Sequence, residues 1–118
     1  MIPWSPLARG FLTGRYKRNE APDSPRLRSD RWLKERFFRP EDFDVVERVE
    51  ELAKEKGVSM AQVALAWLLA KGVTAPIIGA TKVQHVEEAV AALDVHLTVE
   101  ETRRLEELYK PHPVLGHT

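Results

Sequence analysis

Two short apolar segments separated by helical stretches constrain the fold more than any other feature of this sequence. The first, residues 1–7, carries prolines on both sides of Trp4 and is predicted to be an extended strand. The second, residues 73–78, is an apolar run that ends at Gly79. A strand, a helical crossover and a second strand form the βαβ unit of a parallel sheet. Two strands alone make a poor sheet, and the sequence offers no others, so we expect the partners that the first strand needs to be missing.

Residues 40–71, in the second half of the chain between these segments, are predicted to be helical, because apolar residues recur there every three or four positions. The first helix begins at Pro40, whose fixed φ suits a first helical position, and ends before Gly57. The second spans residues 60–71 behind a capping box formed by Ser59 and Gln62. It has so few polar positions that we expect burial on more than one side.

Two further helices are predicted in the last third of the chain. One spans residues 82–93 behind a capping box of Thr81 and Gln84. Its apolar face is formed by Val83, Val86, Val90 and Leu93. The last helix is preceded by a capping box that begins at Thr98. This helix runs to Tyr109, its closing aromatic residue. Residues 110–118 contain two prolines and a glycine and are predicted to be an irregular tail.

Residues 8–39 show no persistent apolar period and are predicted to be a long basic loop. Residues 1–39 carry ten Lys or Arg against four Asp or Glu, a net charge of +6. Residues 40–118 carry eight against fourteen, a net charge of −6, so the whole chain is formally neutral. A chain charged in this way can bind an anion on its first third.

Composition excludes several classes of protein. A chain of 118 residues with 43% apolar and 31% charged residues fits one small globular domain. The absence of cysteine excludes a disulfide framework, cysteine-ligated zinc and thiol catalysis. No apolar run is long enough for a membrane span and no signal peptide opens the chain, so we expect a cytoplasmic protein.

Weaker signals point away from metals and nucleic acids. His112 and His117 lack further ligands nearby, so we expect no metal site. Arginines alternate with aromatic residues over residues 15–39, but no nucleic-acid-binding module accompanies them, so we expect no nucleic-acid partner. One asparagine, two glutamines and no cysteine suggest a thermophilic source.

Two segments are candidates for anion binding, and for each the alternative is an ordinary turn or loop that binds no ligand. Residues 76–82 place Gly79, Thr81 and Lys82 at a helix start, where backbone N–H groups attract a phosphate. The alternative is an ordinary strand-to-helix turn. Residues 4–15 combine a serine, two glycines and two arginines that suit a diphosphate, or form a flexible basic loop. Both segments follow predicted strands, which places them at one sheet edge.

Four runs carry a resemblance to a known family: WSPLARGFLTGRY (residues 4–16), QVALAW (62–67), PIIGAT (76–81) and LDV (93–95). In this order and spacing they resemble the C-terminal third of the aldo/keto reductase family. The resemblance implies an α/β fold class: a mostly helical fragment of a (β/α)8 TIM barrel. We expect about two short strands and four to five helices, equivalent to the last two βα units of the barrel.

The same resemblance implies an NADP(H) site. The cofactor's pyrophosphate would lie along Trp4, Ser5, Pro6, Leu7, Ala8 and Arg9. Arg15 stands where the family usually has lysine. The adenosine 2′-phosphate would lie beside Gly79, Thr81 and Lys82.

The adenine contacts implied by the resemblance depart from the family's pattern. Glu88 matches the family's acidic contact, but Ala89 replaces an asparagine, so we expect weak cofactor binding. His85 stands where the family has glutamine or arginine, and whether it compensates stays open.

The family's catalytic groups are a tyrosine acid with an aspartate, a lysine and a histidine, all from the first half of the barrel. Their motifs do not occur here, so we expect no catalytic residue and no carbonyl reduction by this chain alone. Whether it is an enzyme stays open, as does its substrate. The alternative is a non-catalytic helical module that forms a homo-oligomer through its exposed barrel core. A third possibility is a truncated gene product or excised fragment with no independent role. The exposed apolar residues would be Val63, Leu65, Trp67, Leu68 and Ile77.

Overall fold

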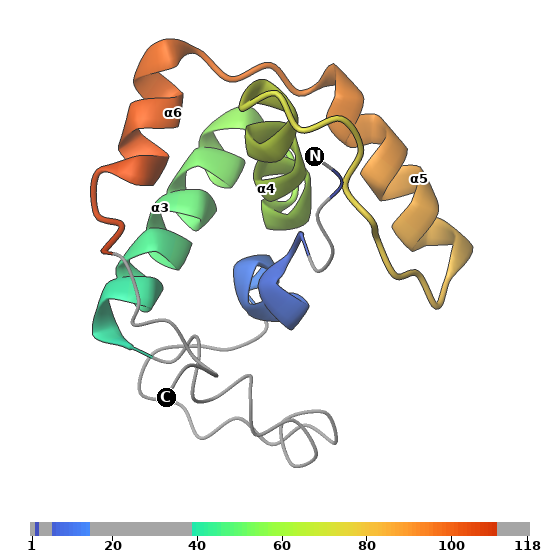
Figure 1. The fold of residues 1–118 in the computed structure, drawn as a ribbon, viewed down its shortest axis with the longest axis horizontal. Coiled ribbons are helices and arrows are strands. Elements are labelled where there is room, and N and C mark those ends of the chain that lie inside the picture. The colour runs from blue at the N-terminus through green and yellow to red at the C-terminus, as the bar shows by residue number, and fades with distance from the viewer. Residues whose placement is uncertain (1, 3–5, 15–38, 111–118) are drawn as a thin grey trace.

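The computed structural model describes residue 2, residues 6–14 and residues 39–110, and these residues are almost entirely helical (Figure 1). The elements in chain order are the 3-10 helix η1 (Ala8–Thr13), α3 (Pro40–Lys56), α4 (Met60–Ala70), α5 (Val83–Ala91), the 3-10 helix η2 (Ala92–Asp94) and α6 (Val99–Glu106). Helix α4 occupies the centre, with α3 and α6 packed to one side of it and α5 on the other.

The start and end of α3 follow the sequence prediction. Pro40 is the first helical residue, and the backbone N–H of Arg39 donates to a carboxylate oxygen of Asp42 at 3.2 Å. Gly57 ends the helix with a φ of +67°, in the left-handed region that favours glycine. The N–H of Val58 then donates back to the carbonyl of Ala53 at 3.1 Å. These contacts explain why the helix covers the expected residues.

Two predicted capping boxes are confirmed. At the start of α4, the N–H of Gln62 donates to the Ser59 hydroxyl at 3.1 Å, and the N–H of Ser59 donates to the Gln62 side-chain oxygen at 3.0 Å. At the start of α6, Thr98 and Glu101 make the same reciprocal pair at 3.1 and 2.9 Å. Each box satisfies backbone donors that a helix start leaves without an intrahelical acceptor.

The core lies where α3, α4 and α6 meet. Its buried members are Val49, Leu52, Ala53, Val63 and Leu105. Leu12 of η1 is half-buried against this cluster. Helix α4 buries four consecutive residues, Val63 to Ala66, so the expectation that it is buried on more than one side is confirmed. The prediction that Val63 and Leu65 form an exposed barrel core is wrong, because Val63 packs against α3 and α6 and Leu65 is also buried.

The strand predicted over residues 73–78 is not formed. Within the described residues there is no strand, and only Ile77 takes part in an isolated β-bridge. A short apolar segment becomes a strand only when neighbouring strands pair with it, and Ile77 remains half exposed. The strand predicted over residues 1–7 lies largely outside the described residues.

Three local predictions need further correction. The last helix, predicted to run to Tyr109, ends at Glu106. Residues 8–13, predicted to begin a loop, form η1, which ends at Gly14 with a φ of +79°; residues 15–38 lie outside the described part of the chain. The predicted Thr81–Gln84 capping box is not formed, because α5 begins one residue later, with Lys82 as the N-cap and no side-chain cap. Its apolar face is continuous as predicted, but it is exposed rather than buried.

Candidate functional site

The most open of the predicted anion-binding residues lie in the turn that enters α5. Gly79, Thr81 and Lys82 are all exposed. A methyl group built on Gly79 would meet no heavy atom within 4 Å, so the space over this turn is open. The first N–H groups of a helix lack intrahelical acceptors, so this turn offers backbone donors, a hydroxyl and an ammonium group within a few residues. That donor set suits a phosphate group.

Lys82 differs from most of the basic residues in the described part of the chain; Lys110 is the other lysine there that makes no ion pair. Every Lys and Arg from Arg39 to Arg104 makes an ion pair with a carboxylate, with the single exception of Lys82. Its ammonium group is therefore available to an external anion. Close to a helix N-terminus this positive charge is also unfavourable for the helix dipole, so a bound anion would relieve an unfavourable placement.

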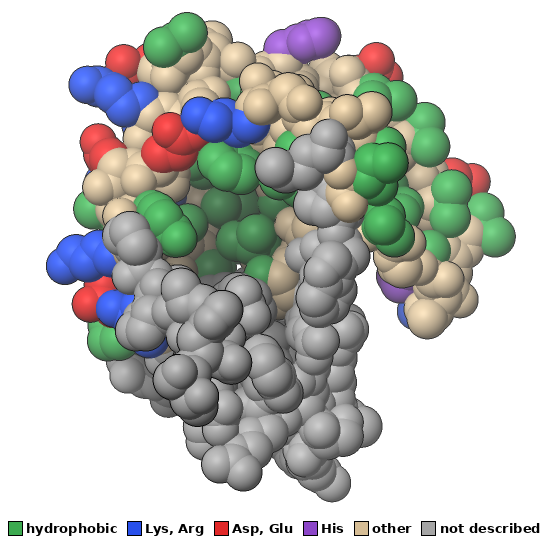
Figure 2. Space-filling view, viewed as in Figure 1, with side chains coloured by type: hydrophobic (Ala, Val, Ile, Leu, Met, Phe, Trp, Pro, Cys, Tyr) green, Lys and Arg blue, Asp and Glu red, His purple; other side chains and the backbone are tan. Residues whose placement is uncertain are grey.

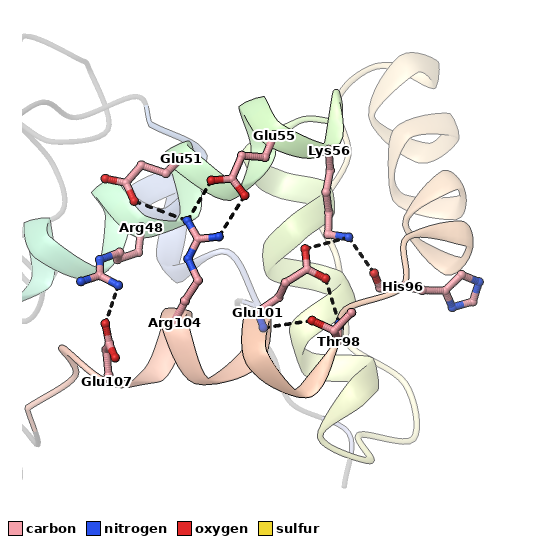
Figure 3. A network of polar contacts seen from close by, with 9 residues as sticks. All are labelled: Arg48, Glu51, Glu55, Lys56, His96, Thr98, Glu101, Arg104 and Glu107. Carbon is pink, nitrogen blue, oxygen red and sulfur yellow. Dashed lines mark hydrogen bonds and ion pairs between the residues drawn. The ribbon is translucent and has the colours of Figure 1, made fainter.

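The paired charges form a network that joins α3 to α6 (Figure 3). The guanidinium of Arg104 donates to both carboxylate oxygens of Glu55 at 2.9 Å. This contact lowers the pKa of Glu55 and raises that of Arg104. Beside it, the Lys56 ammonium lies 2.9 Å from a Glu101 carboxylate oxygen and donates to the His96 carbonyl. The pKa of Glu101 is lowered, first by the N–H of Thr98 and then by Lys56.

A second polar cluster joins α4 to α6. The indole N–H of Trp67 donates to the Glu106 carboxylate at 2.8 Å. The Lys71 ammonium lies 3.0 Å from the same carboxylate and 5.9 Å from the centre of the Trp67 ring. Lys71 and then Trp67 lower the pKa of Glu106. Sequence reasoning missed both clusters, because the residues that they join are far apart in the chain: 39 positions separate Trp67 from Glu106, and 49 separate Glu55 from Arg104.

The adenine-side residues lie on a different face of α5 from its apolar stripe. His85, Glu88 and Ala89 are half-buried and recur with helical spacing on the side that packs against α4. There the side-chain amide of Gln62 donates to the Glu88 carbonyl at 3.2 Å. The structure thus places the phosphate-side residues in the open and the adenine-side residues against α4.

The other predicted segment is only partly described. Trp4, Ser5 and Arg15 lie outside the described residues, and of Arg9 only the backbone in η1 is described. Pro6, Leu7 and Ala8 are half-buried where η1 begins. Ala8 has a φ of +50°, which is uncommon for a residue other than glycine.

The two predicted segments lie beside different elements of the described fold. Element η1 packs against α3 and α4, whereas the turn at residues 79–82 leads into α5. The described residues also lack two further features. These residues contain no cluster of three or more His, Asp or Glu side chains that would hold a metal ion. Nor does any helix among them have the length and apolarity required to cross a membrane.

Comparison with known proteins identifies relatives over almost the whole chain. The family model described as "Aldo/keto reductase family" matches residues 1–110. An aldo-keto reductase of Fusarium vanettenii is 43% identical over 121 residues, which cover 100% of this chain and 31% of the relative. An aldo-keto reductase of Schizosaccharomyces pombe whose name specifies NADP(+) is 34% identical over 119 residues, covering 98% and 34%. The chain thus spans about a third of the length of these relatives.

A solved structure has the same arrangement of elements. A glycerol dehydrogenase of Gluconobacter oxydans superposes with a TM-score of 0.73 at 24% sequence identity. The match covers 99% of this chain and 37% of the dehydrogenase. Its fold is a TIM barrel, so the described helices correspond to part of such a barrel.

Proposed function

The chain belongs to the aldo/keto reductase family, and we propose that it binds NADP(H) through the exposed turn at residues 79–82 and does not reduce carbonyls on its own. The observation that carries this proposal is the unpaired Lys82 ammonium beside Thr81 and the open space over Gly79. The relative named for NADP(+) supports the choice of cofactor.

The residues of the turn fit the phosphate on the adenosine ribose. Lys82 supplies positive charge, the Thr81 hydroxyl and the N-terminal amides of α5 supply donors, and Gly79 leaves room for close approach. On the adenine side, His85, Glu88 and Ala89 are half-buried against α4, so we propose that they contribute less than the turn. The first segment, Trp4 to Arg9 with Arg15, would hold the pyrophosphate.

The proposed lack of reductase activity follows from the chemistry of the reaction. Bound NADPH supplies a hydride, but its transfer to a carbonyl also needs a positioned proton donor. Within the described residues the one tyrosine is Tyr109, which is largely exposed beyond the end of α6. Together with the fraction of the relatives' length that this chain spans, this supports a binding role without catalysis by the chain alone.

Titration of NADPH fluorescence tests the binding proposal. Lys82→Ala removes one charge-assisted contact, so we expect binding to weaken by about 10- to 100-fold. Gly79→Ala places a methyl group over the turn, where it meets no heavy atom of the protein within 4 Å, and is expected to weaken binding by obstructing the approach of the phosphate. Lys54→Ala is the matched control, because it removes an exposed lysine on α3 that pairs with Glu50.

Comparison with NADH, which lacks the 2′-phosphate, completes the test. We expect wild type to prefer NADPH and Lys82→Ala to bind both cofactors equally. Equal weakening by Lys54→Ala, or no saturable NADPH binding at all, would refute a phosphate site at the turn. Steady oxidation of NADPH with a panel of aldehydes, followed by absorbance, would refute the proposal that the chain is inactive alone.

A further inference from the structure

The side chain of Gln62 joins two helices through the two ends of a single amide. Its oxygen accepts from the backbone N–H of Ser59 at 3.0 Å and completes the cap of α4. Its nitrogen donates to the backbone carbonyl of Glu88 in α5 at 3.2 Å. The first contact lies within one helix start, whereas the second joins residues 26 positions apart and reaches the helix that follows the proposed cofactor turn, residues 79–82.

We propose that Gln62 is a positioning residue for the cofactor turn, because it clamps α5 against α4. Lys82 is the N-cap of α5, and Glu88 lies about 9 Å further along the same helix. A shift of α5 at Glu88 therefore moves Lys82 with it. This inference rests on the proposed function of the turn and adds a residue that acts on it from α4, without contact between Gln62 and the cofactor.

The α4 side of the clamp is a fixed point of the fold. Val63, the residue after Gln62, has no exposed surface and packs in the core. The backbone N–H of Gln62 donates to the Ser59 hydroxyl at 3.1 Å. Exchanging the amide oxygen and nitrogen would place a donor against the Ser59 N–H and an acceptor against the Glu88 carbonyl. Only one orientation of the amide satisfies both partners, and in it Gln62 caps α4 and clamps α5 at once.

The α5 side of the clamp lies on the face that packs against α4. Figure 2 shows hydrophobic side chains gathered over the surface of α5, whereas Glu88 and Ala89 are half-buried towards α4. Ala92, in the adjoining η2, is only 1% exposed. The small side chains of Ala89 and Ala92 let the two backbones approach closely, which brings the Glu88 carbonyl within reach of Gln62. A carbonyl oxygen has two lone pairs, so it can accept this bond beside an intrahelical one.

Two substitutions of Gln62 and one of Ser59 separate the clamp from the cap. Gln62→Glu keeps an oxygen for the Ser59 N–H, since glutamate also suits the third position of a capping box, but it has no N–H for the Glu88 carbonyl. Gln62→Met is neutral and lacks both contacts, so it shows whether the added charge causes an effect. Ser59→Ala is the matched control, because it removes half of the cap and leaves the clamp.

Titration of NADPH fluorescence with the full chain is the first measurement. One neutral hydrogen bond corresponds to a factor of about 3 to 10, so we expect Gln62→Glu and Gln62→Met each to weaken NADPH binding by that factor. Ser59→Ala should bind NADPH as wild type does. Gln62→Glu and Ser59→Ala each lose one hydrogen bond and should both lower the urea midpoint, so a loss of stability alone would not separate them.

The distance between α3 and α5 is the second measurement, and it needs no cofactor. The chain contains no cysteine, so Lys54→Cys and Glu87→Cys introduce a unique pair of exposed sites for spin labels, one on α3 and one on α5. Double electron–electron resonance then gives the distance distribution between the labels. We expect a shifted or broader distribution when Gln62→Glu or Gln62→Met is added, and an unchanged one when Ser59→Ala is added.

The two measurements distinguish a failure of the clamp from a failure of the cofactor site. Wild-type NADPH affinity in Gln62→Met, or an equal loss of affinity in Gln62→Glu and Ser59→Ala, would overturn the proposal. If wild type itself does not bind NADPH, the proposed function fails and the label distances decide the clamp alone. In that case an unchanged distribution in Gln62→Met would overturn it, and a shifted or broader one would retain Gln62 as the residue that positions α5.

Discussion

The core formed by α3, α4 and α6 makes a quantitative prediction for the substitution Val63→Ala. Val63 has no exposed surface and packs in the same cluster as Leu52 and Leu105. The substitution removes two methyl groups, which costs about 1.6 kcal/mol of transfer free energy, and the cavity that they leave adds about 1 kcal/mol. The higher helix propensity of alanine offsets about 0.5 kcal/mol. We therefore expect the free energy of unfolding to fall by about 2 kcal/mol.

The matched control is Val99→Ala, which removes the same two methyl groups from a side chain that is 90% exposed. We expect its free energy of unfolding to stay within about 0.5 kcal/mol of wild type. Urea unfolding followed by circular dichroism gives both values, and the slope against urea should be unchanged. The corresponding fall in melting temperature for Val63→Ala is about 8 °C in a chain of this size.

Two outcomes would refute the reasoning behind this prediction. If Val63→Ala lost less than about 0.5 kcal/mol, the three-helix cluster would not be the core of the folded chain. If Val99→Ala lost as much as Val63→Ala, the α6 surface at Val99 would be buried in solution. Measurement at low protein concentration keeps self-association from masking either effect.

Three further predictions concern the polar contacts. Ser59→Ala removes the cap of α4 and should destabilise the chain by about 1 kcal/mol in urea unfolding, whereas Ser59→Thr should retain most of that stability. Arg104→Ala breaks an exposed bidentate pair, so its melting temperature should fall by only about 2–4 °C, and 0.5 M NaCl should reduce the difference from wild type. The folded-state pKa of Glu101 lies below its ordinary value of 4.5, so its contribution to stability is present above pH 4.5 and is lost as the pH falls through the folded-state pKa. The urea midpoint of wild type should therefore decrease as the pH is lowered below 4.5, and it should decrease less steeply in Glu101→Gln. An equally steep decrease in this variant would refute the assignment of the effect to Glu101.

The helices could be predicted from the sequence because their signals are local. Ser59 and Thr98 each lie three residues before a glutamine or glutamate, and Gly57 provides a left-handed stop. These interactions form between residues that are close in the chain, so the pattern alone locates them. The exception is Thr81, which has the same spacing to Gln84 but does not cap α5.

The strand at residues 73–78 and the exposure of the apolar faces could not be predicted in this way. Whether Ile77 pairs in a sheet depends on strands elsewhere, and whether Val63 or Val90 is covered depends on which helices pack against it. Both valines lie on apolar helix faces, yet one is fully buried and the other largely exposed. Of the candidate site, the open turn at Lys82 could be located from sequence, but its lack of an ion-pair partner required the structure.

Helix α5 also has a consequence for how the chain opens locally. It has no buried side chain of its own and is anchored through η2 and one side-chain hydrogen bond from Gln62, whereas α3 and α4 carry most of the core. Its backbone amides should therefore exchange with solvent deuterium through a local opening of low free energy, while those of α3 and α4 exchange only on global unfolding. The proposed cofactor turn would then belong to the least protected helical unit among the described residues.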